Sequence, residues 1–171
     1  MFEKSLLARF GREPETATSA LVRELAAFAG LPEELAGVWL EPRAPGAWSP
    51  AQVTEHVLKV NVGMGKTLYL LRRDAPLPLQ ARVPGTFLAG KAQAPDFSHP
   101  GAPRAWAVLG PQWERMRSRL LLEVEQTRDW SARTWFHPYF GDLDALGWVQ
   151  AAAFHMAHHR RQLQAVVRWR E

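Results

Sequence analysis

Residues 155–162 read His155-Met156-Ala157-His158-His159-Arg160-Arg161-Gln162 and lie in a long segment with helical spacing of its apolar residues. At about 100° per residue, His155 and His159 fall in the middle of one apolar face. The other members of that face are Trp148, Val149, Ala152, Met156 and Leu163. Residues four positions apart stack one turn apart on a helix, so both imidazoles can reach a single ion. The segment predicts a helix from Asp144, its N-cap, to about Trp169.

An earlier segment repeats this pattern and adds a third inward histidine. Ser49 is an N-cap, Pro50 the first helical residue and Gln52 the capping-box partner, so a helix is predicted from here to about Arg73. Its inward face is formed by Val53, Val57, Val60, Met64, Leu68 and Leu71. His56 lies in this stripe, whereas Glu55 lies off it and is expected to be solvated.

Two further helices complete the expected fold. The first runs from Pro14 to about Phe28, ends at Gly30, and is followed by a separate short turn that Pro32 opens. The other runs from Pro111 to about Arg128, with a helical lead-in over 103–109 and a kink or break at Pro111. Strand signals are sparse, and long loops are expected at 41–48, 74–102 and 129–143. The chain is therefore predicted to be an all-α protein, one four-helix-bundle domain over residues 1–171 with long inter-helix loops.

Composition excludes several kinds of site. The 171 residues include no cysteine, so disulfides, thiolate zinc sites and cysteine nucleophiles are ruled out. The N-terminus has no signal-peptide layout, and no stretch is long and apolar enough to span a bilayer, which makes a cytoplasmic protein without a membrane partner the expectation. The formal charge of +4 raises nucleic acid as a partner, but the arginines are scattered and no binding signature accompanies them.

Three inward histidines on two helices have two physical explanations. Each could be a core residue hydrogen-bonded to a carbonyl group or to water. An unpartnered buried imidazole would cost about 1–3 kcal/mol, and a shared metal ion would remove that cost. Neutral imidazole is a preferred ligand of zinc, nickel, copper and iron. The residues alone leave both explanations open.

Several stretches of the chain resemble the DinB/YfiT-like superfamily. Residues 48–56, Trp-Ser-Pro-Ala-Gln-Val-Thr-Glu-His, are similar to the start of that superfamily's second helix. Residues 155–162 are similar to its last-helix motif, HxxHHxxQ, and residues 137–143, His-Pro-Tyr-Phe-Gly-Asp-Leu, with Trp148, resemble one of its branches. The order of the helices and the long second loop also agree. Arg161 departs from the pattern, because many relatives have a small residue there.

The resemblance implies an up-down-down-up bundle with one divalent metal ion, zinc or nickel, on His56, His155 and His159. These are the residues that the helical faces select independently. His158 matches the middle histidine of the motif, which is not usually a ligand. Gln162 could orient a ligand histidine or a bound water. His137 and Tyr139 precede the last helix and could approach the open side of the metal.

Three protein ligands leave a coordination position open, which is typical of catalytic rather than structural sites. The resemblance implies either metal-dependent hydrolases or transferases that join thiols such as bacillithiol or mycothiol to electrophiles, in stress response or detoxification. A non-catalytic bundle that binds a metal or a small molecule is the alternative, and a DNA-associated stress protein is a third reading. The apolar, Trp-rich chain is also expected to form a homodimer, as bundles of this family often do.

Overall fold

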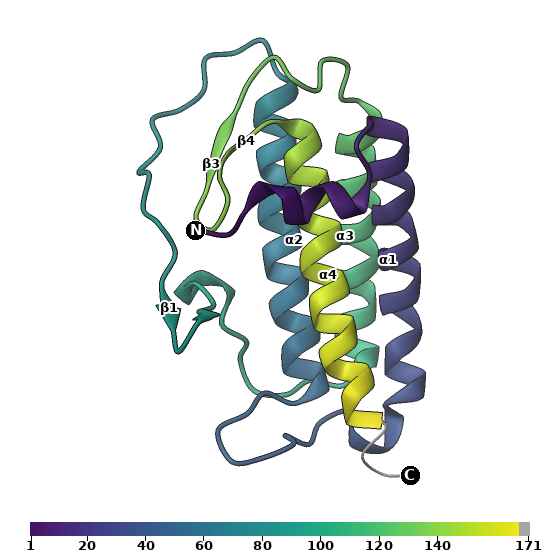
Figure 1. Ribbon diagram of the computed structural model, residues 1–171. Coiled ribbons are helices and arrows are strands. Elements are labelled where there is room, and N and C mark those ends of the chain that lie inside the picture. The colour runs from purple at the N-terminus through teal and green to yellow at the C-terminus, as the bar shows by residue number, and fades with distance from the viewer. Residues whose placement is uncertain (168–171) are drawn as a thin grey trace.

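Four long helices form an up-down-down-up bundle in the computed structural model, which describes residues 1–167 (Figure 1). They are α1 (Pro14–Glu34), α2 (Pro50–Arg72), α3 (Trp106–Glu125) and α4 (Ala145–Val167). Helices α1 and α4 run in one direction, and α2 and α3 run in the other. The expected all-α four-helix bundle is confirmed. The predicted end of the last helix at Trp169 lies outside the described residues.

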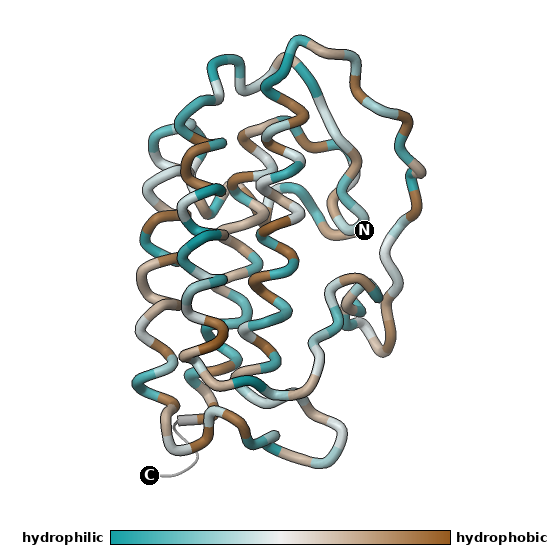
Figure 2. Tube along the Cα trace, turned by 180° about the vertical axis from the view of Figure 1, so that it is seen from behind, coloured by the Kyte–Doolittle hydropathy of each residue, from teal (hydrophilic) through white to brown (hydrophobic). Residues whose placement is uncertain are grey.

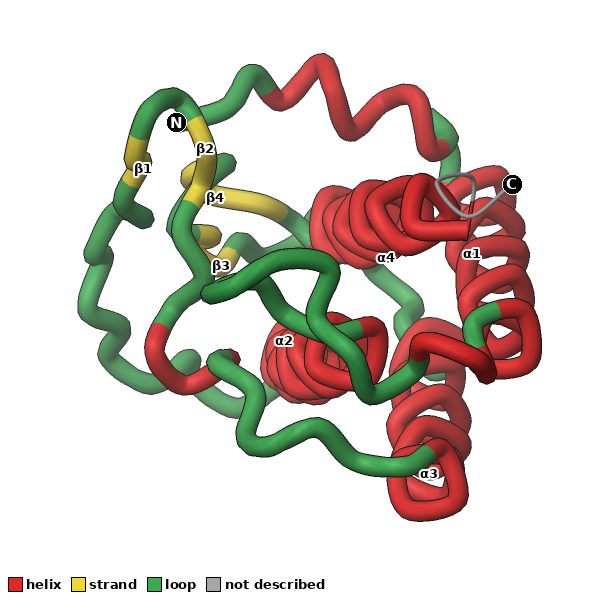
Figure 3. The backbone as a smooth tube through the Cα atoms, turned by 90° about the horizontal axis from the view of Figure 1, so that it is seen from below, coloured by secondary structure: helices red, strands yellow, loops and turns green. Residues whose placement is uncertain are grey.

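The packing order places α2 beside α4, which is the arrangement that the site requires. Helix α1 packs on α4, α4 on α2, and α2 on α3, as the view from below shows (Figure 3). Because α2 and α3 are parallel, the chain must return along the bundle between them. It does so through residues 73–105, called the crossover below, which lie outside the bundle beside α2.

Several short elements accompany the four helices, and the two hairpins among them were not predicted from the sequence. The crossover contains the hairpin β1 (Phe87–Leu88) and β2 (Lys91–Ala92) and the 3-10 turn η3 (Asp96–Ser98). A second hairpin, β3 (Trp135–His137) and β4 (Gly141–Leu143), precedes α4. The 3-10 helices η1 (Lys4–Phe10) and η2 (Ala36–Val38) lie before and after α1. The strands have two or three residues each, too few for a period-two pattern to stand out.

The core fills the space between the four helices. Hydrophobic and hydrophilic residues alternate along each helix, as expected for helices with one buried face (Figure 2). The fully buried large side chains include Leu21, Phe28, Leu68, Trp113, Leu120, Met156 and Leu163. The ring of Phe28 stacks on that of Trp113, with centroids 5.0 Å apart. No helix within residues 1–167 has the length and apolarity needed to cross a membrane.

The predicted helix starts next to the site are confirmed. The Ser49 hydroxyl oxygen accepts a hydrogen bond from the Gln52 backbone N–H at 3.3 Å. The Gln52 side-chain oxygen accepts one from the Ser49 backbone N–H at 3.0 Å. The Asp144 carboxylate accepts the N–H of Gly147 at 2.8 Å and so caps α4. These caps fix where α2 and α4 begin and hence which side chains face inward.

The structure corrects the predicted bounds of two helices, and both of these helices continue through a proline. Helix α1 continues through Gly30 and includes Pro32, because Leu31 and Leu35 are both buried and carry the packed face onward. Helix α3 begins at Trp106 and runs unbroken through Pro111, but it ends at Glu125 rather than at Arg128. Pro111 is the sixth residue of α3, so its missing N–H removes one helical hydrogen bond, and the helix continues across it with Leu109, Trp113 and Met116 buried.

Candidate metal centre

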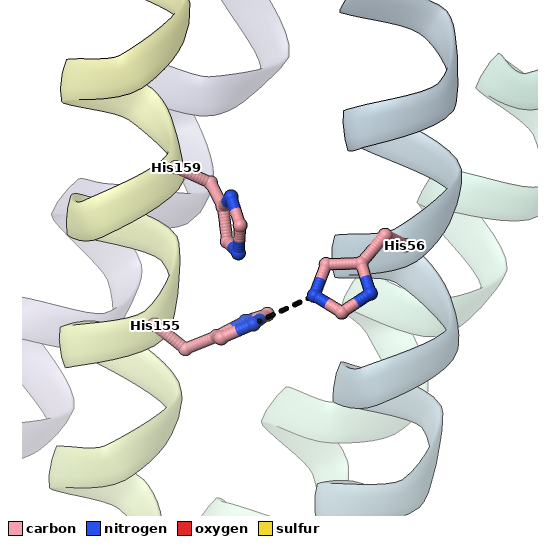
Figure 4. Close-up of side chains that lie close together, drawn as sticks. All are labelled: His56, His155 and His159. Carbon is pink, nitrogen blue, oxygen red and sulfur yellow. Dashed lines mark hydrogen bonds between the residues drawn. The ribbon is translucent and has the colours of Figure 1, made fainter. Parts of the chain in front are cut away.

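Three histidine side chains converge between α2 and α4 (Figure 4). His56 comes from the second turn of α2, and His155 and His159 come from consecutive turns of α4. One ring nitrogen from each histidine lies within 4.8 Å of the other two. The Nε2 atoms of His56 and His155 are 3.1 Å apart. The structure thus brings together the three residues that the helical faces selected, in a geometry that could hold a metal ion.

Hydrogen bonds on the far side of two rings determine which nitrogen faces inward. Nδ1 of His56 lies 3.0 Å from the carbonyl oxygen of Ser98. Nδ1 of His159 lies 2.9 Å from Oε1 of Gln162. A carbonyl or amide oxygen can only accept, so Nδ1 carries the proton in both rings and each Nε2 presents a lone pair. This is the arrangement seen around ligand histidines, where an acceptor fixes the tautomer and the ring orientation.

His155 differs from the other two histidines. Its Nδ1 is buried and has no hydrogen-bond partner within the part of the chain that the structure describes. Either tautomer therefore leaves a polar group unsatisfied, and such groups are rare in native proteins. With Nε2 protonated, His155 could donate to His56, but then Nδ1 would be a buried lone pair without a donor. With Nδ1 protonated, two Nε2 lone pairs would face each other at 3.1 Å, which a cation between them would relieve.

The three imidazoles are held in the neutral form that a metal requires. Burial lowers the pKa of His56, against the opposing effect of its bond to the Ser98 carbonyl. Burial, and then the neighbouring histidines, lower the pKa of His155 well below its ordinary value. Burial is also the main reason that the pKa of His159 falls to about 3. Near neutral pH, protons therefore do not compete for these nitrogens.

The donor set fits a small divalent ion. Two nitrogen ligands at about 2.1 Å from a tetrahedral zinc lie about 3.4 Å apart. The 3.1 Å separation between His56 and His155 is close to that value. The third nitrogen lies within 4.8 Å of these two, so a shared ion would require it to move closer. Imidazole nitrogen suits zinc, nickel, copper and iron rather than magnesium or calcium, which prefer oxygen.

The remaining candidates lie around this cluster and outside it. The Gln162 side chain lies beside the cluster and accepts a hydrogen bond from His159. His158 is exposed, and its ring lies 5.0 Å from that of His159 without joining the cluster of ligand atoms. His137, at the end of β3, packs against Trp148 with ring centroids 4.9 Å apart, and burial lowers its pKa to about 4. The Tyr139 hydroxyl donates to the Gln93 carbonyl. Neither His137 nor Tyr139 belongs to the ligand cluster within residues 1–167.

The crossover and the β3–β4 hairpin form a wall next to the cluster. Arg82 makes a two-pronged ion pair with Asp142, with both N–O distances at 2.7 Å. The Gly85 N–H donates to the Pro138 carbonyl at 2.9 Å. A Cβ atom at Gly85 would lie 2.1 Å from the Tyr139 ring, so only glycine allows this approach. These contacts hold the crossover in place, and its η3 turn carries Ser98 to His56.

The expectation that Glu55 is solvated was wrong. Glu55 is 5% exposed and forms ion pairs with Lys59 at 2.9 Å and with Arg104 at 3.2 Å. Burial acts to raise the pKa of Glu55, but the hydrogen bond from Lys59 and the charge of Arg104 outweigh it, and the net shift is downward. Arg104 belongs to the crossover, so its proximity could not be foreseen from the faces of α2. Glu55 thus ties the crossover to α2 one residue before His56.

Comparisons with known proteins concern the family and the fold of the chain. Residues 18–163 match the family model of the DinB superfamily, which is often metal-binding. The crystal structure of TT2238, a four-helix bundle protein, is similar to this chain with 30% sequence identity and a TM-score of 0.65. That similarity covers 89% of this chain and 98% of the other. No functionally curated protein matches the chain.

Proposed function

The chain belongs to the DinB superfamily, and from that premise we propose that it is a metal-dependent thiol S-transferase. In this proposal, one divalent ion, zinc or nickel, is held on His56, His155 and His159. The substrates are a low-molecular-weight thiol, such as bacillithiol or mycothiol, and an electrophilic small molecule. Removal of reactive electrophiles places the activity in detoxification or stress response.

The observation that carries the proposal is the pair of outer hydrogen bonds on two of the three rings. The Ser98 carbonyl and the Gln162 amide oxygen each accept from an Nδ1, at 3.0 and 2.9 Å. Both bonds direct an Nε2 lone pair toward the same point between α2 and α4. Histidines that served only as buried core residues would not require two Nε2 lone pairs to face the same point.

The charge of the cluster favours an anionic substrate group. Within residues 1–167, the cluster of ligand atoms comprises three neutral imidazoles and no carboxylate. A bound divalent ion would keep its full charge there and would stabilise a thiolate at its open position. Glu55, which precedes His56 on α2, is already paired with Lys59 and Arg104. A divalent ion can lower the pKa of a bound water or of a bound thiol, so neither reaction requires this carboxylate. The affinity of zinc for thiolate sulfur favours the transferase.

The proposed reaction is a nucleophilic substitution at carbon. The thiol loses its proton to solvent, its sulfur forms a bond to the electrophilic carbon, and the leaving group departs with the electron pair of the bond that breaks. The role of the protein is to hold the metal ion and to orient the reactants. His56 and His155 fix the site from two different helices, and Trp48 packs on the His56 ring with centroids 5.2 Å apart. The Trp48 ring thereby shields the imidazole from water.

Turnover with a fluorogenic electrophile tests the proposal. Chelated protein is reloaded with zinc or nickel and mixed with monochlorobimane and one thiol at a time: bacillithiol, mycothiol or cysteine. We expect conjugation above the uncatalysed rate only with metal, and its loss in His155→Ala. The outcome against the proposal is a metal-loaded protein that adds nothing to the uncatalysed rate with any of these thiols.

The alternative readings predict other outcomes in the same experiments. A non-catalytic bundle would take up the metal but show no turnover. A hydrolase would show metal-dependent turnover of ester or amide substrates without any thiol. A DNA-associated protein would be retained on a DNA column in a salt-dependent manner, independently of metal. The homodimer expected from the sequence stays a prediction that light scattering addresses.

A further inference from the structure

A groove lies between α2 and α3, on the flank of α2 opposite the histidine cluster. It encloses about 460 Å³, within the range of pockets that hold small molecules. Its floor is apolar and includes Gly65, Met116 and Leu120, and Lys66 and Arg119 lie at its exposed rim. Gly65 faces Leu120 in this floor, where a Cβ atom would make an ordinary van der Waals contact at 3.8 Å. The groove shares α2 with the histidine cluster but none of the cluster's residues.

One polar side chain in this groove is unexplained by the fold. Asn61 lines the groove and is 0% exposed, yet both its Nδ2 and its Oδ1 have no hydrogen-bond partner among the described residues. A buried amide with no partner at either end is costly, and native structures satisfy most such groups. Thr54 and Thr67, two other buried polar residues of α2, bond to backbone carbonyls of their own helix. Asn61 alone offers a donor and an acceptor that nothing on the helix uses.

The charge around the groove is positive. The Tyr69 ring in its wall is surrounded by the guanidinium groups of Arg72, Arg73 and Arg119, at 5.1, 5.1 and 5.7 Å from the centroid. One buried carboxylate, Glu123, forms ion pairs with both Arg72 and Arg119. The three arginines around Tyr69 therefore carry more positive charge than this carboxylate neutralises. Lys66 adds a further positive charge at the rim. The positive charge would therefore attract an anion to this flank, and it would not strengthen the binding of a neutral or cationic ligand.

We propose that this α2–α3 groove is a second binding site, for a small amphipathic organic anion. Its apolar body lies on the floor against Gly65 and Leu120, a polar atom meets the amide of Asn61, and its negative group meets Lys66. Met116, which also lines the groove, has a flexible and polarisable side chain that can re-pack to admit the ligand to Asn61. The site is independent of the proposed metal chemistry.

Anilinonaphthalene sulfonate is a suitable probe, because it combines a sulfonate, an N–H group and apolar rings. Fluorescence titration of the folded, full-length protein is expected to show saturable binding of one probe per chain. Asn61→Leu, Lys66→Glu and Gly65→Leu should each weaken binding at least tenfold. Gly63→Leu is the matched control, since Gly63 lies on the same helix outside the groove. It should bind the probe within twofold of the original protein.

Two further variants locate the probe if it binds elsewhere. Chelation and His56→Ala should leave probe affinity unchanged, because the histidine cluster is not part of the groove. Phe97→Ser tests the exposed apolar side chains of the crossover, where Phe97 is 68% exposed. Loss of binding in either variant would overturn the proposal. It would also be overturned if all three groove variants bound the probe as tightly as the original protein, or if no saturable binding were seen. Lys66→Glu changes a surface residue and keeps the test valid if Asn61→Leu or Gly65→Leu fails to fold.

Discussion

Nδ1 of His56 lies 3.0 Å from the carbonyl oxygen of Ser98, a residue 42 positions later in the chain. Ser98 is fully buried in the η3 turn of the crossover, and its own hydroxyl donates to the Pro95 carbonyl at 2.7 Å. The crossover is therefore more than a connection between two parallel helices. It supplies the acceptor that orients one of the three imidazoles in the candidate metal centre.

The first prediction concerns this contact. Ser98→Ala removes the hydroxyl that holds the η3 turn, so the carbonyl that faces His56 should be less well positioned. We expect the metal dissociation constant to rise by up to about tenfold, the lower end of the effect of outer groups on metal affinity. Competition with a calibrated chelator measures it. Ser19→Ala is the matched control, because its hydroxyl also donates to a backbone carbonyl, at 2.8 Å, but in α1. An equal effect of both variants would contradict the assignment.

The second prediction concerns Gln162, whose Oε1 accepts from Nδ1 of His159 at 2.9 Å. Gln162→Leu removes the acceptor and should weaken metal binding by about tenfold. Gln162→Glu keeps an acceptor and places a negative charge near the site, so affinity should hold or improve. The same chelator competition measures both variants. If the leucine and glutamate variants bind metal equally well, Gln162 does not orient His159.

The third prediction concerns the pH dependence of stability. An unfolded histidine has a pKa near 6.5, whereas the folded pKa of His137 is about 4 and that of His159 about 3. The folded state therefore binds fewer protons than the unfolded state below pH 6.5. The histidine contribution to stability is fully present above that pH and is lost as the pH falls toward the folded values.

Urea unfolding of chelated protein at pH 7.5, 6.0 and 5.0 measures this effect. We expect the free energy of unfolding to fall across that series. The paired carboxylates of Glu55 and Asp142, whose pKa values are lowered, contribute a loss in the same direction at lower pH. His159→Gln should flatten the profile between pH 6.5 and 5. A free energy of unfolding that stays constant or rises from pH 7.5 to 5.0 would argue against buried, neutral histidines.

Local signals in the sequence were enough to predict the helices and the faces of the ligand residues. The four-residue spacing of His155 and His159 and the Ser49 cap are properties of single helices, so they could be read without the fold. The contacts made by the crossover are not local. Ser98 contributes its backbone carbonyl, a group that every residue has and that no sequence pattern identifies. Arg104 forms an ion pair with Glu55, which lies 49 residues earlier in the sequence. Asn61 occupies an ordinary core position of α2, and only the structure reveals that its amide has no partner.

The fourth prediction is that the metal matters more for activity than for folding. The core between the helices is built from large apolar side chains, such as Phe28 and Trp113, that do not touch the histidine cluster. Chelated protein should therefore keep its helical circular dichroism at room temperature. Metal in thousandfold excess over its dissociation constant should add about 4 kcal/mol, seen as a higher melting temperature. Unfolding of the chelated protein at room temperature would instead identify the ion as a structural requirement.

The most direct test of the central claim is elemental analysis of protein purified without an affinity tag. We expect about one equivalent of zinc, nickel or a similar divalent metal per chain, and loss of nearly all of it in His159→Ala. His158→Ala is the matched control, a histidine one position away on the same helix whose ring lies outside the ligand cluster. It should retain the metal. A metal content that is the same in His159→Ala as in the original protein, or absent from both after incubation with zinc and nickel, would contradict the account.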